Sequence, residues 1–98
     1  MRKITKAERD ELVKAIFLEL ERSDDLPGGN VTVTYEVGDD LRFEIESERD
    51  PNGMPTRYMV VGIVNGIDTE AITIHGASKA EEFYRDIDSV VRMCTLDA

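Results

Sequence analysis

The sequence predicts one α+β domain over residues 1–98, with two helices packed on one face of a four-stranded antiparallel meander. Near each end of the chain, a capping-box pattern precedes an amphipathic run, which is typical of a helix. Between these runs, two segments alternate strictly between apolar and polar residues, and two more flank an Asn-Gly turn. The expected order of elements is therefore α-β-β-β-β-α.

The first helix is expected from Thr5 to about Arg22. Thr5 and Glu8 have the spacing at which each side chain can bond the backbone amide of the other. The residues at 23–30 include Pro27 and two glycines, which cannot continue a helix. The apolar side chains that follow the capping box fall on one helical stripe, as in a core-facing helix: Leu12, Val13, Ile16, Phe17 and Leu20.

The first two strands are expected at residues 31–37 and 41–48, joined by Gly38-Asp39-Asp40. Opposed residues of an antiparallel pair share a face, so a slip of one residue turns a whole strand over. Pairing Val37 with Leu41 sends the apolar side chains of both strands inward and the polar ones outward. The turn is therefore expected to be of odd length.

The third strand is expected at residues 57–64 and the fourth at 69–75, on either side of the Asn65-Gly66 turn. The third strand is apolar on both faces, with Met59, Val61 and Ile63 on one and Tyr58, Val60 and Val64 on the other. The apolar residues Ile72 and Ile74 of the fourth strand are expected on the same face as Met59 and Val61 of the third.

The last helix begins at the capping box of residues 78–81. Its apolar residues form a narrow stripe that ends at Cys94. A cysteine on such a stripe predicts a core position rather than a reactive thiol, because no neighbour in sequence would activate it.

The charge balance excludes two classes of partner. The chain holds 21 acids and 12 bases, a net charge of −9. Nucleic-acid backbones and anionic membranes are bound by Lys and Arg clusters, so neither is expected as a direct partner. No apolar run approaches the roughly 20 residues that cross a bilayer. The single cysteine excludes an internal disulfide and favours a cytoplasmic location.

No catalytic, cofactor or metal site is expected. His75 is the only histidine, so a zinc site or catalytic pair with two imidazoles is excluded. The phosphate-binding and nucleophile-elbow motifs are absent. The segment from Asp50 to Gly53 is similar to the start of a calcium loop, but its glycine comes too early and Val61 stands where the bidentate glutamate belongs.

The excess acid is concentrated in residues 19–50, which hold 11 acids and 3 bases, a net charge of −8. Alternate strand residues on one face stand roughly 6.6–7 Å apart, comparable to the phosphates of a nucleic-acid strand. Clustered like charges cost stability, which favours a binding role. The other interpretation is that an acidic face keeps the domain in solution. The row on the outer face of the first hairpin and its turn comprises Glu36, Glu44, Glu46, Glu48, Asp39 and Asp40, with Arg42 to offset them.

An apolar patch is expected beside this row, on the second face of the third strand: Tyr58, Val60 and Val64. Such a patch is either covered or used for binding. We therefore expect a non-enzymatic inhibitor or regulator whose carboxylates occupy a basic surface of a nucleic-acid-handling protein. Phage proteins that block restriction or CRISPR complexes are of this type in charge and size. The alternative is a structural subunit that forms a homodimer, or joins a larger complex, through the apolar patch.

Overall fold

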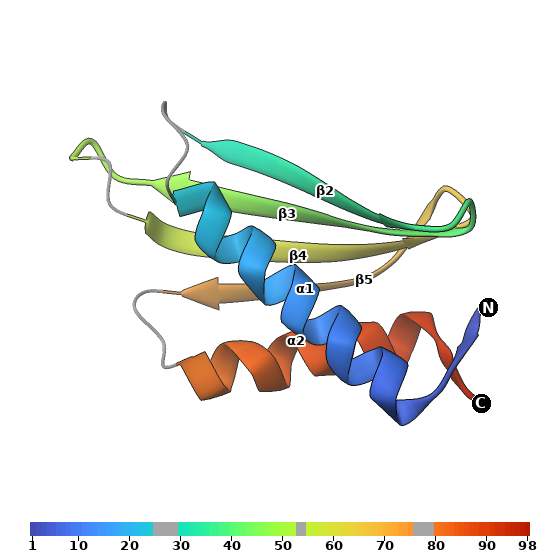
Figure 1. Cartoon of the computed structure of the whole chain (residues 1–98). Coiled ribbons are helices and arrows are strands. Elements are labelled where there is room, and N and C mark those ends of the chain that lie inside the picture. The colour runs from blue at the N-terminus through green and yellow to red at the C-terminus, as the bar shows by residue number, and fades with distance from the viewer. Residues whose placement is uncertain (25–29, 53–54, 76–79) are drawn as a thin grey trace.

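The computed structural model describes residues 1–24, 30–52, 55–75 and 80–98. The predicted fold class is confirmed, because two helices stand before and after a four-stranded antiparallel sheet with strands in chain order (Figure 1). The elements are α1 (Lys6–Asp24), β2 (Val31–Val37), β3 (Leu41–Arg49), β4 (Pro55–Val64), β5 (Ile67–His75) and α2 (Ala80–Cys94). The capping contacts predicted at residues 78–81 and most of the loop predicted at 23–30 lie outside the described residues.

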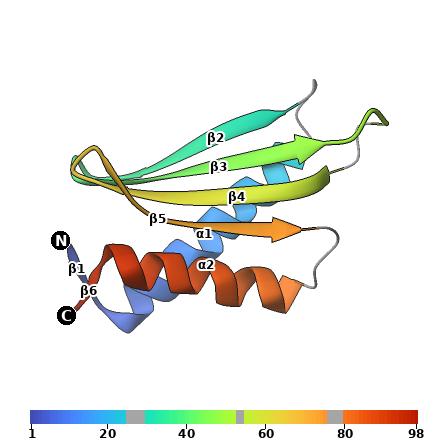
Figure 2. The ribbon, with the colours of Figure 1, turned by 180° about the vertical axis from the view of Figure 1, so that it is seen from behind.

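Two short strands join the ends of the chain. β1 (Lys3–Ile4) and β6 (Leu96–Asp97) pair in parallel beside the helices (Figure 2). The Leu96 amide donates to the Arg2 carbonyl and the Ala98 amide donates to the Ile4 carbonyl, each at 2.9 Å. Neither strand was predicted, because a segment this short has no alternation to detect.

Both helices pack on the same face of the sheet, which we call the inner face (Figures 1 and 2). α1 contacts β2 and β3, α2 contacts β4 and β5, and the helices contact each other. The stripe predicted on the first helix faces this core, and Leu18 on its far side is exposed. The core includes several side chains without exposed surface: Ile16, Phe43, Ile45, Val60, Ile87, Val90 and Val91.

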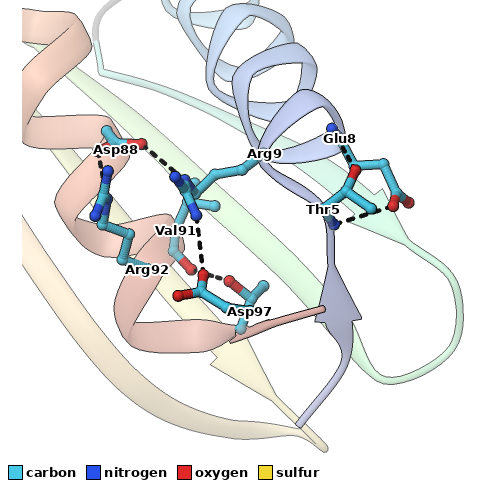
Figure 3. Close-up of polar contacts among 8 residues, drawn as sticks. Thr5, Glu8, Arg9, Asp88, Val91, Arg92 and Asp97 are labelled. Atoms are coloured by element: carbon cyan, nitrogen blue, oxygen red, sulfur yellow. Dashed lines mark hydrogen bonds and ion pairs between the residues drawn. The ribbon is translucent and has the colours of Figure 1, made fainter.

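The predicted capping box begins α1. The Thr5 amide donates to Glu8 Oε1 at 3.0 Å, and the Glu8 amide donates to Thr5 Oγ1 at 3.1 Å (Figure 3). The bond from the Thr5 amide holds the pKa of the Glu8 carboxyl below its usual value. Local sequence alone therefore fixes where this helix starts.

Arg9 ties α1 to the C-terminal part of the chain, and only 7% of its surface is exposed. Its Nη1 donates to Asp97 Oδ1 at 3.0 Å, and its Nε lies 3.5 Å from Asp88 Oδ1 (Figure 3). Arg92 Nε donates to the other Asp88 oxygen at 2.7 Å. Burying the Arg9 charge without partners would be costly. Because its partners Asp88 and Asp97 lie on α2 and β6, the two ion pairs hold α1 against both elements.

The first hairpin has the predicted register. Val37 pairs with Leu41 across a three-residue turn, Tyr35 pairs with Phe43, and all these side chains lie on the inner face. Gly38 opens the turn at a φ of 63°, a left-handed conformation that glycine adopts without steric cost.

The second hairpin has the predicted turn but a different register. Asn65 and Gly66 have φ values of 53° and 80°, as a type I′ turn requires. Beyond the turn, a β-bulge shifts the pairing by one residue, because Ile63 pairs with Asp68 whereas Gly62 pairs with Glu70. An unbulged hairpin would place Met59 opposite Ile72. The bulge instead pairs Ile72 with Val60 and turns the rest of β5 over.

The predicted faces of β4 are wrong, because the pairing of β4 with β3 places Val60 beside the buried Ile45. Tyr58 and Val60, expected on the outer face, are 8% and 0% exposed and belong to the core, and Val64 packs against it. Met59 and Val61, expected beside Ile72 and Ile74, lie on the opposite face from Ile72. The Ile74 side chain lies outside what the structure describes. Two helices can cover only one face of the sheet, and a strand that is apolar on both sides does not show which face it buries.

Gly62 allows α2 to approach the sheet closely. A Cβ atom at this position would lie 2.2 Å from the Sγ of Cys94, which is far inside contact distance. Cys94 is buried at the predicted core position, and this burial raises the pKa of its thiol, with Glu70 adding to the effect. The spacing of α2 from β4 thus depends on the absence of a side chain at Gly62.

Replacing Gly62 by Ala is expected to destabilise the protein by about 1–3 kcal/mol, because the new methyl group overlaps the Cys94 sulfur. In Gly62→Ala/Cys94→Ala, the methyl group takes the space that the sulfur leaves. The double variant should therefore be more stable than the sum of the two single losses predicts. Urea unfolding of all four proteins measures this coupling, and strictly additive losses would contradict the close contact.

Candidate functional site

The outer face of the sheet is the one broad surface that the two helices leave open. Seen from this side, the strands lie in front of α1, and α2 runs beside β5 (Figure 2). None of the described segments crosses over the strands on this side. The described side chains that alternate with the core residues are at least partly exposed on this side, apart from Ile63, which is 3% exposed.

The structure places the four glutamates of the predicted row on this face. Glu36 pairs with Arg42, Glu44 with Thr34 and Glu46 with Thr32 across the first hairpin. Glu36 is exposed, and the three glutamates of β3 are half-buried by their neighbours. Their part in binding stays a prediction.

Two of these glutamates are partly neutralised. Arg57 of β4 pairs with Glu48 and places its Nε 2.6 Å from the carboxylate. Arg42 lies 3.8 Å from Glu44, at the limit of an ion pair. The Arg57 partner was missed because it comes from a strand whose register could not be read from the sequence.

Three acids of the row have no ion pair or side-chain hydrogen bond to any of the described residues: Glu36, Glu46 and Asp39. Glu46 lies between Thr32 on β2 and Met59 on β4. Neither neighbour carries a charge, so the carboxylate of Glu46 is not offset from either adjacent strand.

The two aspartates of the turn play different parts. Arg2 Nη2 donates to Asp40 Oδ1 at 2.7 Å, and this hydrogen bond lowers the Asp40 pKa below its usual value. The Asp40 carbonyl also accepts from the Asn65 amide at 2.8 Å, which joins the two hairpin turns. Asp39 is exposed beside it. Asp40 therefore has a structural role that the sequence did not reveal.

An apolar strip does lie beside the acidic row, but different residues form it. Met59 and Val61 are half-buried on the outer face, next to Glu46 and Glu44 respectively. On their other side they pair with Thr73 and Ala71 of β5, both exposed. The candidate binding face is thus Glu36, Glu44, Glu46, Met59 and Val61, which we call the outer-face patch.

The described residues offer no group of three or more His, Cys, Asp or Glu side chains placed to hold a metal ion. The His75 side chain lies outside what the structure describes. Within the described ranges, neither helix is both long and apolar enough to span a membrane. Comparisons with protein-family models, curated proteins and solved structures find no match to this chain.

Replacing Arg2 by Gln is expected to raise the Asp40 pKa toward the ordinary aspartate range, because the guanidinium that lowers it is removed. A carboxyl with a lowered folded-state pKa contributes stability above its unfolded pKa and loses it as pH falls through the folded pKa. The stability advantage of the wild type over the variant should therefore shrink over that acidic range.

An NMR titration of the Asp40 carboxyl measures the shift, and urea unfolding at several pH values measures the stability. Arg22→Gln is the matched control, since Arg22 pairs with Glu19 on α1. An Asp40 pKa that is the same in wild type and Arg2→Gln would contradict the assignment.

Proposed function

We propose that this protein is a non-enzymatic binding protein that docks its outer-face patch on a basic surface of a nucleic-acid-handling protein in the cytoplasm. Bound there, the carboxylates compete with nucleic acid for the Lys and Arg side chains of the partner. The observation that carries the proposal is the uncovered sheet face, on which an acidic row adjoins an apolar strip.

The composition of the patch suits a protein partner. Met59 and Val61 supply apolar surface that a partner can exclude from water. Glu44 and Glu46 lie beside them at strand spacing, so a partner needs cations around an apolar centre. Charges of this kind speed association and make it sensitive to salt.

Self-association is the weaker candidate. The surface proposed for it from the sequence does not exist, because Tyr58 and Val60 are buried in the core and Val64 packs against it. Two outer-face patches brought together would also oppose Glu36 and Glu46 with carboxylates of the same kind, and like charges disfavour such a contact.

The charge reversal Glu44→Lys/Glu46→Lys is expected to weaken binding to the partner at least about tenfold, because both carboxylates face the contact. The fold should be kept, since both side chains lie on the uncovered face. The matched control is Glu21→Lys/Glu82→Lys, which makes the same charge change at exposed positions on the helices.

The partner is obtained by affinity capture from the native host with elution in a salt gradient. Its affinity for wild type and both variants is then measured with and without competing nucleic acid. Capture of a nucleic-acid-binding protein that nucleic acid displaces supports the proposal. Equal affinity of the folded outer-face variant and the wild type would refute it.

A further inference from the structure

β2 is a sheet edge without the usual protection. Among the strands that the structure describes, the sheet order leaves one side of β2 unpaired. β2 contains no proline and no basic residue, and its register with β3 runs without a bulge. A proline, a basic residue or a bulge in an edge strand normally discourages pairing with another chain, and β2 has none of them. The opposite edge differs, because β5 is bulged.

An apolar groove lies beside the C-terminal part of this edge, at Tyr35–Val37. α1 crosses the sheet obliquely, so its first turns diverge from β2 (Figure 1). The space between them has a volume of about 530 Å³, within the range of protein binding pockets. Its apolar lining includes Ile4, Ala7, Leu12, Ala15, Tyr35 and Val37.

The charges of the groove are acidic. Glu8 and Glu11 line it from α1, and Glu36 lines it from β2. The only cation among its lining residues is Arg2, whose guanidinium is bound by Asp40 at 2.7 Å. An occupant therefore gains from basic side chains as well as from apolar ones.

We propose that β2 accepts an extended basic segment of a partner as an additional strand. Main-chain hydrogen bonds along the edge provide affinity in this mode, and alternate side chains provide specificity. One side of the added strand places apolar side chains in the groove, against Tyr35 and Val37. The other side places Lys or Arg beside Glu36 and continues the outer face. The groove is a second surface, so this interaction goes beyond the function proposed above.

A second copy of this chain is the less suitable occupant. Its β2 would bring Thr32, Thr34 and Glu36 on one side and no cation at all. Cross-strand pairs of opposite charge stabilise a sheet, whereas like charges destabilise it. The charges of the groove thus select a basic partner over self-pairing.

The probe is a fluorescently labelled peptide of alternating lysine and valine, equal in length to β2. We expect the wild type to bind it with an affinity that falls as salt rises, and to ignore the matching peptide of glutamate and valine. On binding, alternate amides of β2 should gain protection from hydrogen exchange, because every second N–H of an edge strand points away from the sheet.

Glu11→Lys/Glu36→Lys should weaken peptide binding about tenfold or more, because both charges line the groove. Glu21→Lys/Glu82→Lys is the control of equal charge, and Glu44→Lys/Glu46→Lys tests the outer-face patch separately. An equal loss in all three variants, or protection of amides outside β2, would overturn the proposal. Sedimentation of the free protein as a dimer with protected β2 amides would also overturn it.

Discussion

The bulge beside Gly62 decides which side chains of β5 join the buried face of β4. The chain gains one residue on β5 between the partners of Gly62 and Ile63, and this extra residue brings Ile72 to the side of Val60. Pairing with β3 sets which side of β4 is buried, because Ile45 lies beside Val60 and Phe43 beside Gly62. Gly62 thereby faces Cys94, where only a glycine leaves room for α2. The bulge turns β5 over to match, so that Ile72 joins the core and Ala71 and Thr73 the outer face.

The sequence predicts best where its pattern is unambiguous. Strict alternation in β2 and β3 gives their register, and Thr5 with Glu8 gives the start of α1. β4 could not be oriented in this way, because apolar residues occupy both of its faces. The partners of Arg2, Arg9 and Arg57 were also missed, since each ion pair joins segments that only the folded chain brings together.

The folded structure redistributes the charge that the sequence concentrates in one block. Asp40 and Glu48 are bound by arginines from other elements, so they contribute less to the outward potential than their number indicates. Glu36 and Glu46 have no ion pair with an arginine among the described residues, so their contribution to that potential is not reduced in this way. Glu36 also lies where the outer-face patch meets the groove beside β2, so one carboxylate adjoins both proposed contact surfaces.

The parallel pairing of β1 with β6 also has a mechanical consequence. The chain enters β1 from one end and leaves β6 at the other, so tension between the termini pulls the two strands along each other. The bonds from Leu96 to Arg2 and from Ala98 to Ile4 then carry the load in shear, and the Arg9–Asp97 bond adds to them. Bonds loaded together resist force better than bonds opened one at a time. Tension between the two termini therefore meets this joint before it reaches the sheet.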